Sequence, residues 1–150
     1  MKVLALCVLL CALMALTESE EVWKKIGSRS FAYISKKMSW DDAEQNCIQL
    51  GGHLASIRSS TEHIALKIMI KENANWNPHV WIGGTDSTEN DVWRWTDGSP
   101  FKYSNWCPGE PNNFILNLSV QHCLQMNYSD RRCWDNVDCW YAIPSICAKG

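Results

Sequence analysis

The chain has 150 residues, a formal net charge of −2 and 11% aromatic residues, among them nine tryptophans. This length suits one domain with a hydrophobic core and is short for two. A near-neutral chain offers no extended basic surface, so we expect it to bind neither nucleic acid nor an anionic membrane. The many large apolar rings also argue against an intrinsically disordered protein.

The first 19 residues have the pattern of a secretory signal peptide. Lys2 precedes an apolar run over residues 3–16, and small or polar residues follow, with cleavage expected after Thr17 or Ser19. The run is shorter than the roughly 20 residues that a membrane-spanning helix needs, and no second apolar run follows. We therefore expect no membrane span, and a secreted, extracellular protein with a single domain over residues 20–150.

Two segments in the first half of the chain carry helix signals. Residues 39–42 (SWDD) have the pattern of a capping box, apolar residues follow at helical spacing, and Gly51-Gly52 ends the run. A second capping box spans residues 59–62, and its helix is expected to end between Asn73 and Pro78.

Short apolar segments elsewhere predict a sheet. The candidate strands are residues 31–34, 54–57, 80–82, 92–95, 123–126 and 146–148. Together with the two helices they predict the α+β class, with the helices segregated from a mostly antiparallel sheet.

Between Gly83 and Gln121 the chain is rich in Gly, Pro, Asn, Asp and Ser. Loops of this length are usually either functional or disordered. Aromatic side chains and a cysteine within the stretch would hold it in place, so we expect an ordered, functional loop. These residues are Trp93, Trp95, Phe101, Tyr103, Trp106 and Cys107.

Six cysteines lie outside the expected signal peptide. An even number in a small secreted domain indicates a set of disulfides, and six cysteines can pair in 15 ways. A zinc site is the alternative, but no two of the six have C-x-x-C spacing, which makes zinc the weaker interpretation. The six are Cys47, Cys107, Cys123, Cys133, Cys139 and Cys147.

Several stretches, in this order and spacing, resemble the C-type lectin-like domain family over nearly the whole mature chain. They are WDDAEQNC, GGHLASI, VWIGG, WRWTDGSPFKYSNWCPGEPNN, QHCLQMN, CWDNVDC and SICAK. Within the family the chain is most similar to small secreted fish lectins and to fish type II antifreeze proteins. The resemblance implies the C-type lectin-like fold, with a long loop region pinned by disulfides.

The resemblance also implies how the cysteines pair. Family members join the first helix to the last strand, here Cys47 to Cys147, and tie the long-loop region with a second bridge, here Cys123 to Cys139. The remaining pair, Cys107 with Cys133, matches an additional bridge of the antifreeze branch.

The stretch PGEPNN, residues 108–113, contains the family's E-P-N triplet. In the family this triplet supplies two calcium ligands, here Glu110 and Asn112, and the proline between them is typically cis. Calcium takes six to eight oxygen ligands, and two sugar hydroxyls complete its coordination there. The order acid-then-amide is linked to mannose, glucose or fucose, and the reverse order to galactose. The resemblance therefore implies a mannose-type site for glycans.

The other half of the implied site departs from the family. Gln121 stands where the family has a Glu, and residues 134–136 read W-D-N instead of W-N-D. Two acids, Glu110 and Asp135, replace three, which should weaken calcium binding. Each sugar hydroxyl would still meet one acid and one amide. We expect a sugar site formed by Glu110, Asn112, Gln121, Asp135 and Asn136, and calcium held weakly by Glu110, Asn112, Asp135 and Asn136.

Alternative interpretations accompany this site. The E-P-N-N stretch could be only a structural turn beside an inactive site, or sugar could bind without calcium. Trp106 and Trp134 could stack on a sugar, although packing in the core is the more common role. Ice binding is a competing function, because the Cys107–Cys133 pair matches the antifreeze branch. A protein-binding lectin-like domain is disfavoured by the intact E-P-N triplet.

The remaining motifs are few. Asn117 and Asn127 begin N-glycosylation sequons. The four histidines lack metal-binding spacing, and the chain has neither a nucleophile elbow nor an H-E-x-x-H motif, so we expect a non-enzyme. The predicted function is a secreted lectin for glycans of microbial or host surfaces, in innate defence or in recognition within mucus or plasma. The sequence is compatible with a monomer and with a homo-oligomer.

Overall fold

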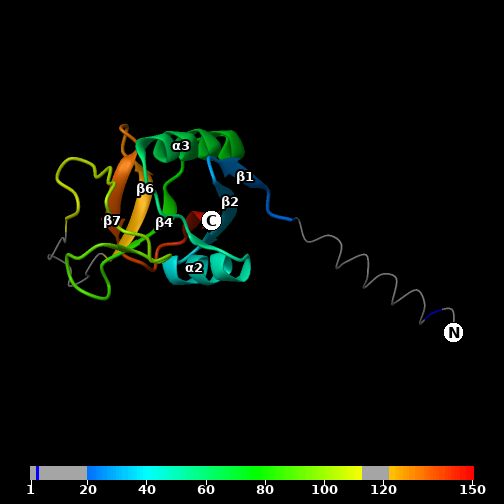
Figure 1. The fold of residues 1–150 in the computed structure, drawn as a ribbon, viewed down its shortest axis with the longest axis horizontal. Coiled ribbons are helices and arrows are strands. Elements are labelled where there is room, and N and C mark those ends of the chain that lie inside the picture. The colour runs from blue at the N-terminus through cyan, green and yellow to red at the C-terminus, as the bar shows by residue number, and fades with distance from the viewer. Residues whose placement is uncertain (1–2, 4–19, 113–121) are drawn as a thin grey trace.

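The computed structural model describes residue 3 and residues 20–112 and 122–150 (Figure 1). The rest of the expected signal peptide, Asn117 and Gln121 lie outside the described residues. The elements in chain order are β1 (Trp23–Ile26), β2 (Arg29–Met38), α2 (Trp40–Gln49), β3 (His53–Leu54), α3 (Ser60–Ala74), β4 (Val80–Thr85), β5 (Arg94–Trp95), β6 (Cys123–Tyr128), β7 (Cys133–Val137) and β8 (Ile143–Lys149). They confirm the predicted α+β class.

The strands form one eight-stranded sheet in the order β1-β2-β8-β4-β6-β7, with β3 on β8 and β5 on β4. The pairings are antiparallel except that of β4 with β8, which meet in parallel at Trp81 and Ser145. The two helices lie on opposite sides of this sheet (Figure 1). Each therefore buries its apolar side against a different core cluster.

The core cluster under α3 contains Leu66, Met69 and Ile70 of that helix together with strand residues such as Val80 and Ile146. The cluster under α2 contains three residues of that helix, Trp40, Ala43 and Cys47. The Trp40 indole also donates a hydrogen bond of 2.9 Å to the carbonyl oxygen of Ile82 in β4. The apolar part of the ring is therefore buried while its N–H keeps a hydrogen-bond partner.

Both predicted helix starts are confirmed. The Ser39 hydroxyl accepts a hydrogen bond from the backbone N–H of Asp42 at 3.3 Å, and the Ser59 hydroxyl accepts one from Glu62 at 3.2 Å. Each bond satisfies a backbone donor that has no partner inside the helix. The second helix ends before Asn75, whose φ of 62° is the left-handed conformation common after a helix.

The strand prediction missed two elements, β1 (Trp23–Ile26) and β7, and overextended two others. Residues 133–137 form β7, although the sequence CWDNV has no clear apolar alternation. Its polar residues Asp135 and Asn136 are buried, and both belong to the candidate site described below. Conversely, the predicted strands at 54–57 and 92–95 shorten to two residues each, in β3 and β5.

Three disulfides tie these elements together. Cys47 of α2 is bonded to Cys147 of β8, Cys123 of β6 to Cys139, and Cys107 of the long loop to Cys133 of β7. These are the pairings that the family resemblance implied. Among the residues that the structure describes, no helix is long and apolar enough to cross a membrane.

Gly52, in the turn from α2 to β3, is expected to tolerate no side chain. A Cβ at this position would overlap the backbone carbonyl oxygen of Ala148 in β8, which cannot move without disturbing the strand. Gly52→Ala should lower the free energy of unfolding by about 1–3 kcal/mol, the usual cost of overpacking. Urea unfolding monitored by tryptophan fluorescence measures this change. An unaltered midpoint and slope would contradict the close approach.

Candidate functional site

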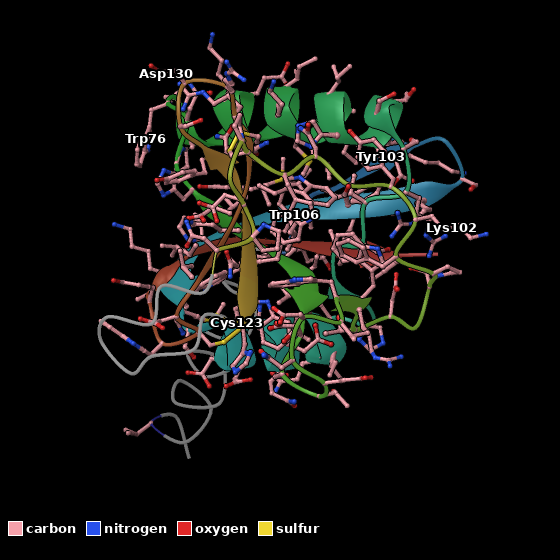
Figure 2. All side chains as sticks on the ribbon, turned by 90° about the vertical axis from the view of Figure 1, so that its left-hand side faces the viewer. Trp76, Lys102, Tyr103, Trp106, Cys123 and Asp130 are labelled. Atoms are coloured by element: carbon pink, nitrogen blue, oxygen red, sulfur yellow. A yellow bond between two sulfur atoms is a disulfide. The ribbon has the colours of Figure 1, made fainter. Side chains whose placement is uncertain are left out.

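Trp134 of β7 anchors the long loop to the sheet. Its side chain is fully buried, and four aromatic rings of the loop surround it with centroids 5.6–6.1 Å away, two of which are labelled in Figure 2. The four rings belong to Trp95, Phe101, Tyr103 and Trp106. The predicted ordering of the loop by its aromatic residues is therefore confirmed for these positions, and Trp134 itself is a core residue that a sugar cannot reach.

A buried histidine on α3 holds the indole of Trp134. The Trp134 Nε1–H donates to Nδ1 of His63 at 3.3 Å, and Nε2 of the ring is hydrogen-bonded to the Asn105 side-chain amide at 2.7 Å. Burial, reinforced by the charge of Lys67, lowers the pKa of His63 to about 4. The ring is thus neutral near pH 7 and serves the packing of β7.

Backbone hydrogen bonds bring the loop alongside the start of β7. The N–H of Cys107 donates to the Trp134 carbonyl at 2.9 Å, and the N–H of Trp134 donates to the Asn105 carbonyl at 2.8 Å. The Cys107–Cys133 disulfide joins the same two segments. Glu110 follows this junction by three residues on one segment and Asp135 by one residue on the other. Pairing of the two segments therefore brings the two halves of the predicted site together.

The E-P-N triplet forms a tight turn in which its side chains and backbone are mutually bonded. The Glu110–Pro111 peptide bond is cis. The backbone N–H of Asn112 donates to Glu110 Oε2 and to Asn136 Oδ1, each at 2.9 Å, and Asn112 Nδ2 donates to Glu110 Oε1 at 2.6 Å. The bond from Asn112 to Asn136 is a direct link between the loop half and the strand half of the site.

Asp135 lies at the centre of the site and is 6% exposed. Its Oδ2 accepts a hydrogen bond of 3.0 Å from Nε2 of Gln125, and its carboxyl group is also hydrogen-bonded to Glu110. Gln125 was absent from the prediction. Its position two residues after Cys123 in β6 could have suggested it, because alternate residues of a strand share a face, and it is paired with Asp135 in the sheet.

Asp135 raises the affinity of the Glu110 carboxyl group for a proton, whereas the hydrogen bond from Glu110 lowers the affinity of Asp135. Burial first, and then the negative charge of Asp135 and the hydrogen bond to it, together raise the pKa of Glu110 to about 7. Burial also raises the pKa of Asp135, while the hydrogen bond from Gln125 opposes the rise. The nearby Asp135 carboxyl group and the burial of Glu110 therefore both favour the protonated form of Glu110 at mildly acidic pH.

Calcium fits this donor set with a low ligand charge. The site offers carboxylate oxygens from Glu110 and Asp135 and amide oxygens from Asn112 and Asn136, which are the hard ligands that calcium prefers. A calcium ion at the site would offset the repulsion between the negative charges of Glu110 and Asp135. No group of three or more His, Cys, Asp or Glu side chains suited to a metal occurs within residues 20–112 and 122–150. These four residues would therefore hold calcium with two carboxylates only.

In the calcium-free protein, we expect the contribution of Glu110 to folding stability to fall as pH rises. Its folded pKa of about 7 exceeds its ordinary value of 4.5, so folding favours the protonated form. The contribution is complete below 4.5 and is lost as the pH passes through 7. His63, whose pKa is lowered to about 4, changes stability in the opposite direction as pH rises. The slope must therefore be isolated by comparison with Glu110→Gln.

The measurement is urea unfolding of both proteins in a calcium chelator at about pH 5 and about pH 7.5. Wild type should lose stability relative to Glu110→Gln at the higher pH. An equal difference at both pH values would show that folding does not raise the pKa of Glu110.

The second glycosylation prediction is contradicted by burial. Asn127 is fully buried, and its Nδ2 donates a hydrogen bond of 3.0 Å to the Pro78 carbonyl. A glycan needs this nitrogen exposed, so Asn127 is not a suitable acceptor. The sequence around Asn127 matches the motif because a motif does not report burial. Asn117 stays a prediction outside the described residues.

Comparison with known protein families places the chain. The family model described as the Lectin C-type domain matches residues 36–149. The chain belongs to the C-type lectin domain family. This agrees with the fold and with the three disulfides.

Relatives of this lectin domain include ice-structuring proteins and lectins. The chain is 39% identical over 127 residues to the type-2 ice-structuring protein of Brachyopsis segaliensis, covering 85% of this chain and 70% of that protein. It is 37% identical over 123 residues to ladderlectin of Oncorhynchus mykiss, covering 82% of this chain and 63% of ladderlectin, less than two thirds of its length. It is 35% identical to the galactose-specific lectin nattectin of Thalassophryne nattereri, covering 85% of this chain and 77% of nattectin.

Solved structures of similar lectin-like domains divide on calcium. A calcium-independent type II antifreeze protein superimposes with a TM-score of 0.75 at 37% identity, covering 89% of this chain and 98% of the other. The calcium-free form of a calcium-dependent type II antifreeze protein gives 0.76 at 29% identity, covering 85% and 97%. The comparison therefore supports the fold equally in both cases and leaves calcium to be judged from the site residues.

Proposed function

We propose that this protein is a secreted lectin that binds glycans of microbial or host surfaces through Glu110, Asn112, Asp135 and Asn136. The observation that carries the proposal is the direct bond between the two halves of the site, from Asn112 N–H to Asn136 Oδ1, beside the hydrogen-bonded Glu110 and Asp135 pair. Acids and amides side by side can accept from and donate to each sugar hydroxyl. Gln121 belongs to the same proposed site by sequence.

In this proposal the four residues are the ligands of a weakly bound calcium ion. When bound, the calcium ion would coordinate sugar hydroxyls. The protein's own residues orient those hydroxyls. Because calcium competes with protons for the carboxylates, calcium binding should strengthen as pH rises through about 7.

A glycan array, run once in calcium and once in chelator, tests this function. We expect binding of mannose-type glycans in calcium and reduced binding in chelator, from the acid-then-amide order of Glu110 and Asn112. The similarity to a galactose-specific lectin makes galactose the essential comparison. Absence of glycan binding in both conditions would refute the lectin function.

Ice binding is the second candidate. It is favoured by the similarity to a type-2 ice-structuring protein and by the Cys107–Cys133 bridge, which the sequence resemblance associates with the antifreeze branch. Thermal hysteresis of the purified protein measures this activity directly. A freezing-point depression no larger than that of an equal concentration of an unrelated protein would exclude it.

A further inference from the structure

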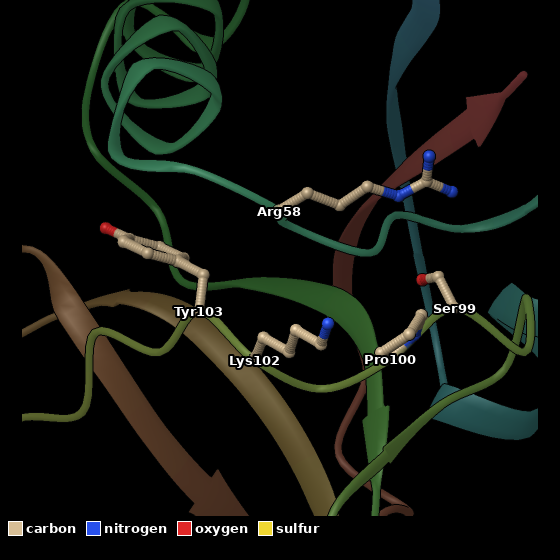
Figure 3. Close-up of a pocket in the computed structure, with 5 residues that line it drawn as sticks. All are labelled: Arg58, Ser99, Pro100, Lys102 and Tyr103. Atoms are coloured by element: carbon tan, nitrogen blue, oxygen red, sulfur yellow. The ribbon is translucent and has the colours of Figure 1, made fainter.

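A second polar pocket lies on the surface and shares no residue with the proposed lectin site. It has a volume of about 330 Å³ and is lined by Arg58, Ser99, Pro100, Lys102 and Tyr103 (Figure 3). Arg58 comes from the segment that leads into α3, and the other four residues come from one short stretch of the long loop. Figure 3 shows the Lys102 and Arg58 side chains extending toward the side of the pocket where Ser99 lies.

Asp97, whose two carboxylate oxygens both accept hydrogen bonds, lies beside the pocket and holds Arg58 in place. Asp97 Oδ1 accepts from the backbone N–H and the hydroxyl of Ser99 at 2.9 and 2.6 Å. Its Oδ2 accepts from the Ser56 hydroxyl at 2.5 Å and from Arg58 Nη2 at 3.3 Å. Burial alone would raise the pKa of Asp97, but the hydrogen bonds from Ser56 and Ser99 and the charge of Arg58 lower it below its ordinary value.

The pocket carries a positive charge that the surrounding carboxylates do not cancel. Behind it, Arg29 pairs with Glu62 at 2.9 Å and lies 3.8 Å from Asp97, while Arg58 lies 3.3 Å from Asp97. These two guanidinium groups and two carboxylates balance each other. The exposed Lys102 forms no ion pair within the described part of the chain, so its charge is in excess.

Arg58 retains donors for a ligand. Within residues 20–112 and 122–150, the Arg58 side chain donates one hydrogen bond, from Nη2 to Asp97. The side chain is 42% exposed. A guanidinium group has five N–H donors in a planar fork that matches an oxyanion. Arg58 can therefore hold Asp97 and a second oxyanion together, with Lys102 supplying a further point charge.

We propose that this pocket binds the acidic group of a saccharide, a sulfate ester or a carboxylate. Arg58 and Lys102 would contact the oxyanion, and the rings of Pro100 and Tyr103 would offer apolar surface to the sugar ring. The volume lies at the lower end of the range for small-ligand sites, sufficient for one acidic group with part of its ring. The saccharide class rests on the proposed lectin function, whereas the oxyanion rests on the pocket alone.

Calorimetric titration of the intact protein tests the proposal. The ligands are a sulfated disaccharide, a disaccharide that contains a uronic acid, and a neutral disaccharide, each at low ionic strength and at about 0.15 M salt. At least one acidic ligand should bind about tenfold more tightly than the neutral one, and Lys102→Gln should remove most of that difference. Salt should weaken the acidic ligand selectively. Which acidic ligand binds identifies the source of the oxyanion.

Lys36→Gln is the matched control, because Lys36 is an exposed lysine on β2 outside the pocket lining. It should leave the affinity unchanged, and Arg58→Gln should lower it as Lys102→Gln does. Equal losses in Lys36→Gln and Lys102→Gln would show a general charge effect and overturn the site. Equal affinity for neutral and acidic disaccharides would also overturn it. Inorganic sulfate binding as tightly as the acidic saccharide would overturn the saccharide as the ligand class.

Glu110→Gln separates this proposal from the lectin function. Acidic-saccharide binding that survives Glu110→Gln and is lost in Lys102→Gln supports the pocket even when no neutral glycan binds. Loss of acidic binding in Glu110→Gln with no change in Lys102→Gln would place the ligand at the lectin site and overturn the pocket.

Discussion

Glu110→Gln is expected to lower the affinity for calcium roughly 100-fold or more and to abolish calcium-dependent glycan binding. Only two carboxylates face the site, so this substitution removes half of its acidic charge and one of its oxygen ligands. The amide is nearly the same size as the carboxyl group, and burial already favours the neutral form of Glu110. We therefore expect the fold to survive the substitution.

Calorimetry with calcium, followed by the glycan array, provides the measurement. Glu89→Gln is the control, since Glu89 is an exposed acid of the long loop. Within residues 20–112 and 122–150 its only ion pair is with Arg94, at 3.4 Å. Glu89→Gln should behave as wild type. Calcium affinity that falls equally in both variants, or that is unaffected by Glu110→Gln, would exclude Glu110 as a ligand.

Removing the Cys47–Cys147 bridge by a double alanine substitution is expected to lower the free energy of unfolding by about 4–5 kcal/mol. The bond joins residues 100 positions apart and ties α2 to the central strand β8. A long loop gives the unfolded chain the most entropy to regain, although enthalpic effects also contribute. This loss is a large share of the roughly 5–15 kcal/mol that stabilises a typical domain.

The matched control is the double alanine variant of Cys123 and Cys139, whose separation is 16 residues. The same relation predicts a smaller loss of about 3 kcal/mol. Urea unfolding of both variants and of wild type ranks the losses. A larger loss from the shorter loop would mean that local packing rather than loop length sets the contribution of each bridge.

Much of the local structure could be predicted from neighbouring residues. The two capping serines, Ser39 and Ser59, start helices because a side-chain hydroxyl satisfies a nearby backbone N–H, an effect confined to four residues of sequence. The strand β7 could not be predicted in this way. Its central residues Asp135 and Asn136 are polar, and they are buried because the loop folds over them.

Only part of the candidate site could be predicted, because motifs along the chain identify some of its residues and contacts between strands supply the others. The motif resemblance selected Glu110, Asn112, Asp135 and Asn136, and the structure places them together. Gln125 was missed because its contact with Asp135 arises from pairing between β6 and β7, ten residues apart. Asn127 was selected as a glycosylation site although it is fully buried and its amide is bonded to the Pro78 carbonyl.

The sequence by itself determined the fold class, the helix starts, the family and, through that family, the cysteine pairs and the E-P-N half of the site. These features depend on short motifs and on spacing along the chain. Only the tertiary structure decided that the helices cover opposite faces of the sheet, that Asp135 raises the pKa of Glu110, and that Arg58 and Lys102 meet in one pocket. Each of these depends on distances between segments far apart in the chain, and electrostatic coupling and burial follow those distances rather than sequence order.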